Sequence, residues 1–281
     1  MTEQLDGLYE RVVQRVAPRG RLLKSWLLAG GISAEMTALE FEGPAGVVSK
    51  VVVRRPGIGT FSQNPNAARD EYRTLLLARA LGLSAPAPVD LDLTGQIFAH
   101  PYLVMEYIEG QLDFTRVHRA DFTLQLAAHL ARIHGADCSS QEISFLQRPA
   151  QEFEQVIGNH PASPDGLLDP GRIREPLASV WPVPRWNEPG LLHGDYWPGN
   201  ILWRDGQLAA VIDWEDACFG DPLEDFAISR LDILWIFGRE AMESFSRYYQ
   251  FLRAVDIRAL PYWDLYAALR LARLVGTDLS G

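Results

Sequence analysis

The spacing of apolar residues changes along this chain from a strand period to a helix period, and that change limits the folds open to it. Near the start lie three short runs rich in β-forming residues, separated by glycine-containing turns: residues 22–28, 35–42 and 47–54. Short strands joined by such turns are typical of an antiparallel meander. A helical stripe precedes them, formed by Leu5, Leu8, Val12 and Val16. The first part of the chain is therefore predicted to be a β-rich lobe that begins with a helix.

The later part of the chain follows a helical period instead. From about residue 119 onward, apolar side chains recur every three or four positions, first at Phe122, Leu126, Leu130 and Ile133 and later within residues 240–255 and 263–274. Strands first and helices afterwards indicate an α+β protein rather than alternating strands and helices. We expect residues 1–108 to form a small N-terminal lobe and residues 109–281 a larger, mainly helical C-terminal lobe.

Two elements near the expected boundary can be predicted from their own patterns. Residues 66–81 are predicted to form a helix, with Asn66 as its N-cap. Residues 102–107 are predicted to form a strand, and a turn-like Ile-Glu-Gly follows it. The hinge between the two lobes should therefore lie near residues 107–110.

Charge and composition exclude some partners. The formal net charge is −10, so the surface repels the phosphate backbone and nucleic acid is not expected as a partner. No apolar run approaches the roughly 20 residues that cross a bilayer, and the first ten residues do not resemble a signal peptide. We therefore expect no membrane contact and a cytoplasmic location, with Cys138 and Cys218 as reduced thiols. No pattern indicates an oligomeric state.

The most informative segment spans residues 193–227. It begins with H-x-D-x-x-x-x-N, in which the named positions are His193, Asp195 and Asn200. A β-hairpin with an Asp-Gly turn should follow, and its second strand ends just before Asp213. This hairpin would place Asn200 at one end and Asp213 at the other, so both can reach the same edge.

Phosphoryl transfer requires side chains of these kinds. A triphosphate is densely anionic, and its transfer depends more on charge neutralisation and alignment than on covalent chemistry. Mg²⁺ prefers oxygen ligands and usually takes only one or two from the protein, which Asn200 and Asp213 can supply. Asp195 can then accept the proton of an attacking hydroxyl, while His193 is expected to brace the loop. The full set, in this order, is hard to obtain by chance.

At these residues the chain resembles known kinases. H-x-D-x-x-x-x-N followed by a strand and an Asp resembles the catalytic loop of protein kinases. HGD, I-D-W-E and G-D-P-L-E-D-F-A resemble more specifically the aminoglycoside phosphotransferase family and its relatives among choline and homoserine kinases. The resemblance spans most of the chain and is strongest over residues 190–227. It implies a protein-kinase-like two-lobed fold, with a small antiparallel-β N-terminal lobe and a larger helical C-terminal lobe.

The resemblance also implies an activity and the residues that perform it. The reaction would move the γ-phosphate of ATP to a hydroxyl of a small molecule with Mg²⁺ as cofactor, and GTP remains open as donor. Asp195 matches the catalytic base, and His193 belongs to the same catalytic loop. Asn200 and Asp213 match the metal ligands. Asp221 matches the residue that ties a helix to the back of this loop.

The nucleotide-binding residues come from the N-terminal lobe. Arg54 stands where the family has a lysine that touches phosphate; it keeps the charge but has a different geometry. Lys50, on the same strand face, remains an alternative. Glu71 would pair with the basic residue, and a solvated salt bridge is the alternative explanation of the two charges. Val52, also on that face, can pack against adenine.

The remaining expected nucleotide contacts come from loops. Gly30, Gly31 and Ser33 resemble the loop that covers the phosphates, although a plain hairpin turn explains these glycines as well. The backbone groups of Glu106 and Ile108 resemble those that read the adenine edge.

Two other functions remain open. A non-catalytic nucleotide-binding module would keep the fold without needing Asp195, Asn200 and Asp213 together. A metal-dependent hydrolase would use the same carboxylates but would want a denser ligand set, often with histidines. The acceptor is open among aminoglycosides, macrolides, amine alcohols, homoserine and sugars. Acidic residues after Asp213 would attract a cationic acceptor or would simply cap a helix.

Overall fold

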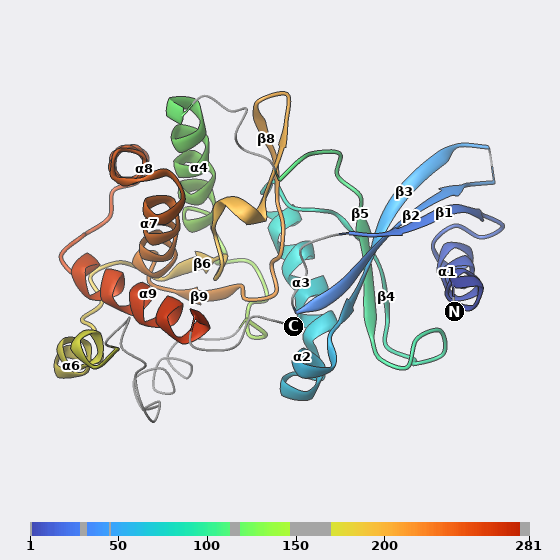
Figure 1. Cartoon of the computed structure of the whole chain (residues 1–281), viewed down its shortest axis with the longest axis horizontal. Helices are drawn as coiled ribbons and strands as arrows, with labels where there is room; N and C mark the ends of the chain where they lie inside the picture. Colours follow the sequence, from blue (N-terminus) through green and yellow to red (C-terminus); the bar gives the residue numbers. More distant parts are fainter. Residues whose placement is uncertain (1, 29–32, 45, 113–118, 147–169, 276–281) are drawn as a thin grey trace. The chain divides into compact units, whose positions relative to one another are not determined.

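A computed structural model describes the chain except residues 1, 29–32, 45, 113–118, 147–169 and 276–281, and it contains two compact units (Figure 1). Unit 1 comprises residues 1–109 together with residues 210–215. Unit 2 comprises residues 110–209 and 216–281. Asp213 therefore belongs to the same unit as Arg54 and Glu71, although it lies far from them in the sequence.

Unit 1 is built on a five-stranded sheet in the order β1-β2-β3-β5-β4, and every neighbouring pair is antiparallel. The strands are β1 (Arg21–Leu27), β2 (Ala34–Glu42), β3 (Val48–Pro56), β4 (Pro88–Asp92) and β5 (Tyr102–Glu106). The predicted meander of β1, β2 and β3 is confirmed, as is the predicted strand at β5. The antiparallel sheet followed by helices confirms the expected α+β fold.

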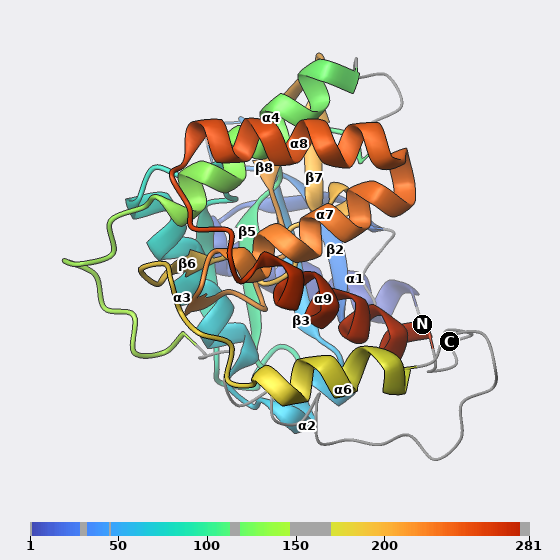
Figure 2. The same cartoon turned by 90° about the vertical axis from the view of Figure 1, so that its left-hand side faces the viewer.

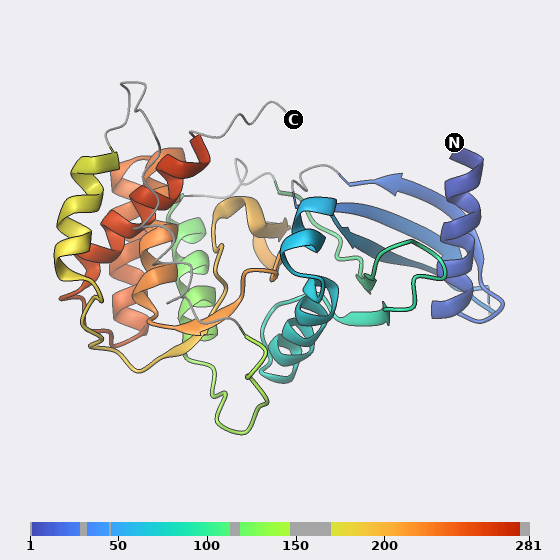
Figure 3. The same cartoon turned by 90° about the horizontal axis from the view of Figure 1, so that it is seen from below.

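Helices lie on both faces of this sheet. α1 (Thr2–Val16) packs on β1 and β2 (Figure 3), and its Tyr9, Val12 and Val13 share one apolar core with Val51 and Val53 of β3. Because side chains alternate along a strand, Val52 and Arg54 face the other side. There the sheet contacts α3 (Ala67–Ala80), which follows the short α2 (Ile58–Gln63).

The predicted helix over residues 66–81 is confirmed as α3 and Asn66 is its N-cap residue, but the side-chain hydrogen bond typical of such a cap is absent. Asn66 occupies the N-cap position with φ −95° and ψ 2°, and its side chain makes no capping hydrogen bond. The turn is closed by Asn64 instead, which accepts the Asn66 backbone N–H at 2.9 Å and donates to Asp70 at 3.1 Å. An Asx turn just before the helix thus takes the place of a side-chain cap.

Unit 2 is mainly helical. Figure 2 shows α8, α7, α9 and α6 following one another across it, and α4 packs on α8. The helices are α4 (Arg119–His134), α6 (Pro170–Val180), α7 (Leu223–Phe237), α8 (Arg239–Leu252) and α9 (Leu260–Val275). α7 contacts both α8 and α9, and its first turns are buried, so it forms the centre of the unit. None of the described helices combines the length and the hydropathy of a bilayer-spanning segment.

Four short strands lie between α6 and α7 in the sequence. β6 (Gly190–Leu192) pairs with β9 (Cys218–Gly220). β7 (Ile201–Arg204) and β8 (Gln207–Val211) form the predicted hairpin, and its turn residues Asp205 and Gly206 both have positive φ, 53° and 74°. Positive φ at both central residues is the geometry that an Asp-Gly hairpin turn favours.

The shared core of α1 and the sheet predicts which substitutions destabilise unit 1. Leu39→Ala removes a side chain that is fully buried in this core, so we expect the free energy of unfolding to fall by about 2–5 kcal/mol. Leu27→Ala, on the exposed end of β1, should change it by no more than about 0.5 kcal/mol. Urea unfolding followed by circular dichroism measures both; equal losses would contradict this core.

Candidate active site

The loop after β6 has a backbone that only glycine can adopt at its second residue. Gly194 has φ +84°, and a Cβ added there would lie 2.1 Å from the backbone oxygen of Asp216. His193, Gly194 and Asp195 therefore pass tightly against the segment that follows β8. The short 3₁₀ helix that follows, Pro198–Asn200, places Asn200 back beside Asp195.

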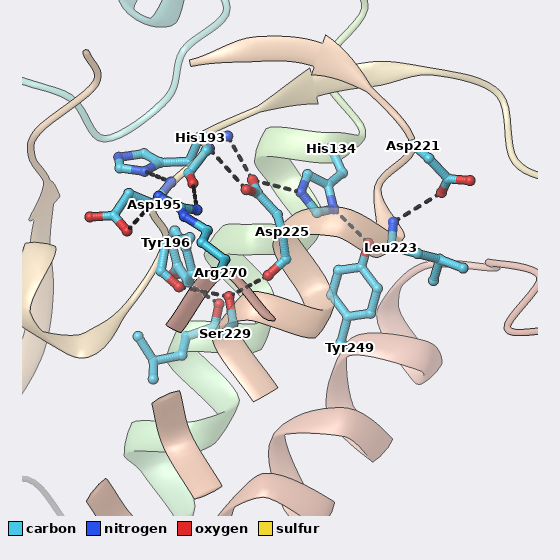
Figure 4. Close-up of polar contacts among 12 residues, drawn as sticks. His134, His193, Asp195, Tyr196, Asp221, Leu223, Asp225, Ser229, Tyr249 and Arg270 are labelled. Carbon is cyan, nitrogen blue, oxygen red and sulfur yellow. Dashed lines mark hydrogen bonds and ion pairs between the residues drawn. The ribbon is translucent and has the colours of Figure 1, made fainter. Parts of the chain in front are cut away.

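Asp225 of α7 holds this loop by its backbone (Figure 4). Its Oδ2 accepts the N–H of His193 at 2.6 Å, and its Oδ1 accepts the N–H of Gly194 at 2.8 Å. The carboxylate is fully buried. Burial alone would raise the pKa of Asp225, but hydrogen bonds from His134 and the loop outweigh it and hold the pKa below its ordinary value.

The role expected of Asp221 is therefore wrong, because Asp225 makes the contacts that tie the helix to the loop. Asp221 instead accepts the backbone N–H of Leu223 at 3.0 Å and the side-chain amide of Asn187 at 3.2 Å. It caps the start of α7 and joins that end to the segment before β6. Both acids belong to the same motif, but of the two it is Asp225 that points at the loop after β6 (Figure 4).

Two other helices, α4 and α8, support the Asp225 carboxylate. His134 of α4 contacts the Asp225 carboxylate through Nε2 at 3.2 Å and the hydroxyl of Tyr249 in α8 through Nδ1 at 2.6 Å. Burial lowers the pKa of His134, so the ring is neutral, with its Nε2 proton donated to Asp225. Ser229, one turn after Asp225, donates to the backbone oxygen of Tyr196 at 2.7 Å. His134 had no assigned role from the sequence.

Asn200 fixes the side chain of Asp195. Its amide nitrogen donates to the Asp195 backbone oxygen at 3.0 Å and to Oδ2 at 2.9 Å. Two acceptors on this side identify the atom as nitrogen, so the amide oxygen faces away from Asp195. The Asp195 backbone N–H donates to Nδ1 of His193 at 3.3 Å, which makes His193 a brace within the loop.

A residue that sequence reasoning missed also reaches this loop. Arg270 of α9 donates from Nη1 to the backbone oxygen of Gly194 at 2.6 Å, and its Nη2 lies 3.4 Å from Asp195 Oδ1. It stands far along the chain in a helix without a recognisable motif. No local spacing in the sequence could have linked it to Asp195.

In unit 1, Arg54 lies among three carboxylates. Its Nε is 2.7 Å from Glu71, and its Nη2 is 2.9 Å from Asp213 Oδ1 and 2.7 Å from Glu215. Its side chain is only 2% exposed. The expected pairing with Glu71 is present and buried, so a solvated salt bridge is excluded. Lys50 instead pairs with Glu109 at 2.7 Å on the surface, so Arg54 is the basic residue of this cluster.

The cluster carries more negative than positive charge. Burial raises the pKa of Glu71 to about 8; Arg54 opposes the shift, and the neighbouring Asp213 and Glu215 add to it. Asp213 has φ +65°, an uncommon conformation for a residue other than glycine. Asp213 Oδ1 is buried, and it lies 2.9 Å from the Arg54 guanidinium. This oxygen is suited to a cation as a further partner.

Each unit carries an oxygen of the kind that Mg²⁺ prefers, and Mg²⁺ usually takes only one or two ligands from a protein. In unit 2 it is the amide oxygen of Asn200, and in unit 1 it is the carboxylate of Asp213. Across the described part of the chain, no group of three or more His, Cys, Asp and Glu side chains is placed to hold a metal ion.

The other expected nucleotide contacts lie in different environments. Val52 is buried on the Arg54 face of β3, and Ser33 Oγ lies 3.5 Å from Arg54 Nη2. The backbone N–H of Glu106 donates to the backbone oxygen of Ala87 at 2.8 Å. No backbone hydrogen bond joins Ile108 to another described residue. Gly30 and Gly31 lie outside the described residues.

The backbone of Gly194 provides a test of the loop. Gly194→Ala adds both left-handed strain and a clash with Asp216, so we expect it to cost about 3 kcal/mol or more of unfolding free energy. Gly206→Ala is the matched control, because it has the same sign of φ but open space around it; about 1–2 kcal/mol is expected there. Thermal unfolding measures the loss of unfolding free energy in both variants. Similar losses would argue against a tightly held loop.

The Arg54 cluster provides a second test. Arg54→Met leaves the buried Glu71 without its cation, and we expect a loss of about 3–5 kcal/mol in unfolding free energy. Arg21→Met breaks the exposed pair with Glu42 and should cost no more than about 1 kcal/mol. Urea titration of both variants measures the difference. A small loss in Arg54→Met would mean that the cluster is open to water.

Comparisons with known proteins agree with this architecture. A model of a phosphotransferase enzyme family matches residues 27–268. Acyl-CoA dehydrogenase family member 11 of Rattus norvegicus is 23% identical over 253 residues, which cover 80% of this chain and 32% of that protein. The chain thus spans about a third of the length of this curated relative.

Two solved structures share the fold over nearly the whole chain. Amicoumacin kinase hAmiN, in complex with AMP-PNP, Ca2+ and Ami, has a TM-score of 0.70 at 16% identity, covering 100% of this chain and 91% of that one. Choline kinase LicA from Streptococcus pneumoniae has a TM-score of 0.66 at 20% identity, covering 98% and 93%. At such identities the likeness shows the fold alone.

Proposed function

We propose that this chain, which belongs to the phosphotransferase enzyme family, is a small-molecule kinase that moves the γ-phosphate of ATP to a hydroxyl of its acceptor. One observation carries the proposal. The carboxylate of Asp195 is held by the amide of Asn200 on a loop whose backbone is fixed by Asp225. GTP is the alternative donor, and the products are the nucleoside diphosphate and a phosphate ester.

Asp195 is the proposed catalytic base. Its side chain is about a third exposed, so it is accessible to an acceptor while its backbone is fixed. As the acceptor oxygen bonds to the γ-phosphorus, the bond from phosphorus to the bridging oxygen of the diphosphate breaks, and the acceptor proton passes to Asp195. His193 supports this role by accepting the N–H of Asp195, rather than by touching the acceptor.

Asn200 and Asp213 are the proposed ligands of Mg²⁺. When bound, the ion would neutralise charge on the phosphates, which is the main demand of this chemistry. Arg54 was expected to touch phosphate directly, but its guanidinium is almost fully buried among three carboxylates. We therefore propose that Arg54 acts on the nucleotide site chiefly by holding Asp213, and that Glu71 fixes Arg54.

The remaining nucleotide contacts are proposed from the sequence resemblance. Gly30, Gly31 and Ser33 would cover the phosphates, and Val52 would pack against adenine. Ile108 would read the adenine edge with its backbone, which makes no hydrogen bond to another described residue. The carbonyl of Glu106 would do the same.

The acceptor is proposed to be a small hydroxylated molecule. The structures that share this fold include a choline kinase and an amicoumacin kinase, whose names already span two unlike acceptors. The fold therefore does not select one chemical class. The formal net charge of −10 makes a nucleic acid an unfavourable acceptor.

The decisive measurement is Mg²⁺-dependent ADP release from ATP across a panel of aminoglycosides, amine alcohols, macrolides, homoserine and sugars. With the right acceptor, Asp195→Asn should lower kcat by about 10²–10⁴-fold, because a general base is lost. The Kd for ATP should stay close to that of the wild type. Asp205→Asn, in the exposed hairpin turn where Asn tolerates positive φ, is the matched control and should keep full activity.

Other outcomes would identify a different function. ATP binding without turnover on any acceptor would favour a non-catalytic nucleotide-binding module. Release of free phosphate that needs no acceptor would favour a metal-dependent hydrolase. Full activity of Asp195→Asn would remove the assigned base, and failure to bind ATP or GTP would remove the proposal as a whole.

A further inference from the structure

Arg270 lies outside the motifs, yet it contacts both the backbone next to the proposed base and the carboxylate of that base. It projects from α9 toward the loop in Figure 4. Its Nη1 donates to the Gly194 backbone oxygen at 2.6 Å, which is a short hydrogen bond with a charged donor. Its Nη2 lies 3.4 Å from Asp195 Oδ1. Arg270 thus fixes the residue before the proposed base and also attracts the carboxylate of that base.

The two oxygens of Asp195 are held from different directions. Oδ2 accepts from the amide of Asn200 at 2.9 Å, and Oδ1 faces the guanidinium of Arg270. One contact comes from the loop that follows Asp195 and the other from a helix at the end of unit 2. A carboxylate held at both oxygens has little freedom to rotate about its terminal bond, so its lone pairs keep a fixed direction.

Arg270 also offsets the repulsion between acids at this point. Its Nη2 lies 3.6 Å from Asp216 Oδ2, on the segment packed against Gly194. Asp232 of α7 is part of the same environment: burial raises the pKa of Asp232 to about 6, the charge of Asp195 adds to the shift and Arg270 opposes it. Without the guanidinium, the charges of these three acids would be less compensated, which would favour movement of the Asp195 side chain.

We propose that Arg270 is a positioning residue that sets the orientation of the Asp195 carboxylate for accepting the acceptor proton. The catalytic consequence of this inference rests on the proposed kinase function. The two contacts of Arg270 with Gly194 and Asp195, which we call the clamp, do not depend on that function. The clamp uses the planar fork of arginine, because two separate nitrogens reach the carbonyl and the carboxylate. A lysine, with one nitrogen, keeps the charge but cannot hold both groups in the same geometry.

The kinetic test compares Arg270→Met and Arg270→Lys with Arg239→Met, which breaks an exposed pair on α8. We expect Arg270→Met to lower kcat by about 10–100-fold with little change in KM for ATP or acceptor, since misplacing a catalytic group costs rate rather than binding. Arg270→Lys should fall between it and the wild type. The control should keep full activity.

A double-variant cycle separates positioning from a general effect on folding. In an Asp195→Asn background, Arg270→Met should change the residual rate by no more than about twofold, because the group that it orients is gone. The same large loss in both backgrounds would overturn the inference. An unchanged kcat in both Arg270 variants would also overturn the inference. In either case, activity of the wild type would still support the proposed function.

Amide hydrogen exchange tests the clamp without any turnover. We expect the peptide covering residues 192–199 to exchange about tenfold faster in Arg270→Met, as a charged hydrogen bond to the loop is lost, and to exchange at the wild-type rate in Arg239→Met. Unchanged exchange would overturn the clamp. If the wild type transferred phosphate to no acceptor, the proposed function would fail, and this measurement would still decide the clamp.

Discussion

The carboxylate of Asp225 accepts two consecutive backbone N–H groups, and the geometry of unit 2 depends on this interaction. A fully buried charge is costly unless several donors satisfy it, and here the donors are His193, Gly194 and the ring of His134. These donors come from the loop and from α4, while Tyr249 of α8 supports His134. The packing of three helices is thereby coupled to the backbone of one short loop.

The two units bury charge in opposite ways. In unit 2 the buried group is an anion, and neutral donors stabilise it, so the arrangement is complete without a ligand. In unit 1 the buried group is the cation Arg54, and three carboxylates surround it. That cluster has three carboxylates and one guanidinium, so it has an excess of negative charge. Unit 2 therefore provides rigidity, whereas unit 1 provides a place where added positive charge is favourable.

The sequence predicted the elements better than the contacts between them. The change of apolar period and the Asp-Gly turn are local patterns, so the order of strands and helices and the β7–β8 hairpin followed from them. The pairing of Arg54 with Glu71 came from a family resemblance. Two acids four residues apart in one motif cannot be told apart without knowing which helix face meets the loop, so the role predicted for Asp221 belongs to Asp225.

Long-range contacts of residues outside the family motifs had no signal in the sequence. Arg270 meets Asp195 only because α9 packs on α7, and no spacing between positions 195 and 270 indicates that. Likewise, Glu215 belongs to the acidic residues after Asp213, but its contact with Arg54 depends on residues 210–215 joining unit 1. Side chains brought together by packing of distant segments thus escape motif reading, even when one partner lies inside the motif.

The arginine at position 54 changes which reagents can report on this protein. The chain has two lysines, Lys24 on β1 and Lys50 on β3, and both are at least partly exposed on the sheet of unit 1. Amine-directed acylating probes, including nucleotide mimics designed for a lysine beside the phosphates, would label this outer surface and leave position 54 unmodified. Lysine-directed cross-linkers would attach only to unit 1, so a cross-linking experiment with them would give no cross-link that starts in unit 2. Guanidinium-directed or carboxyl-directed chemistry is the appropriate choice for labelling this chain.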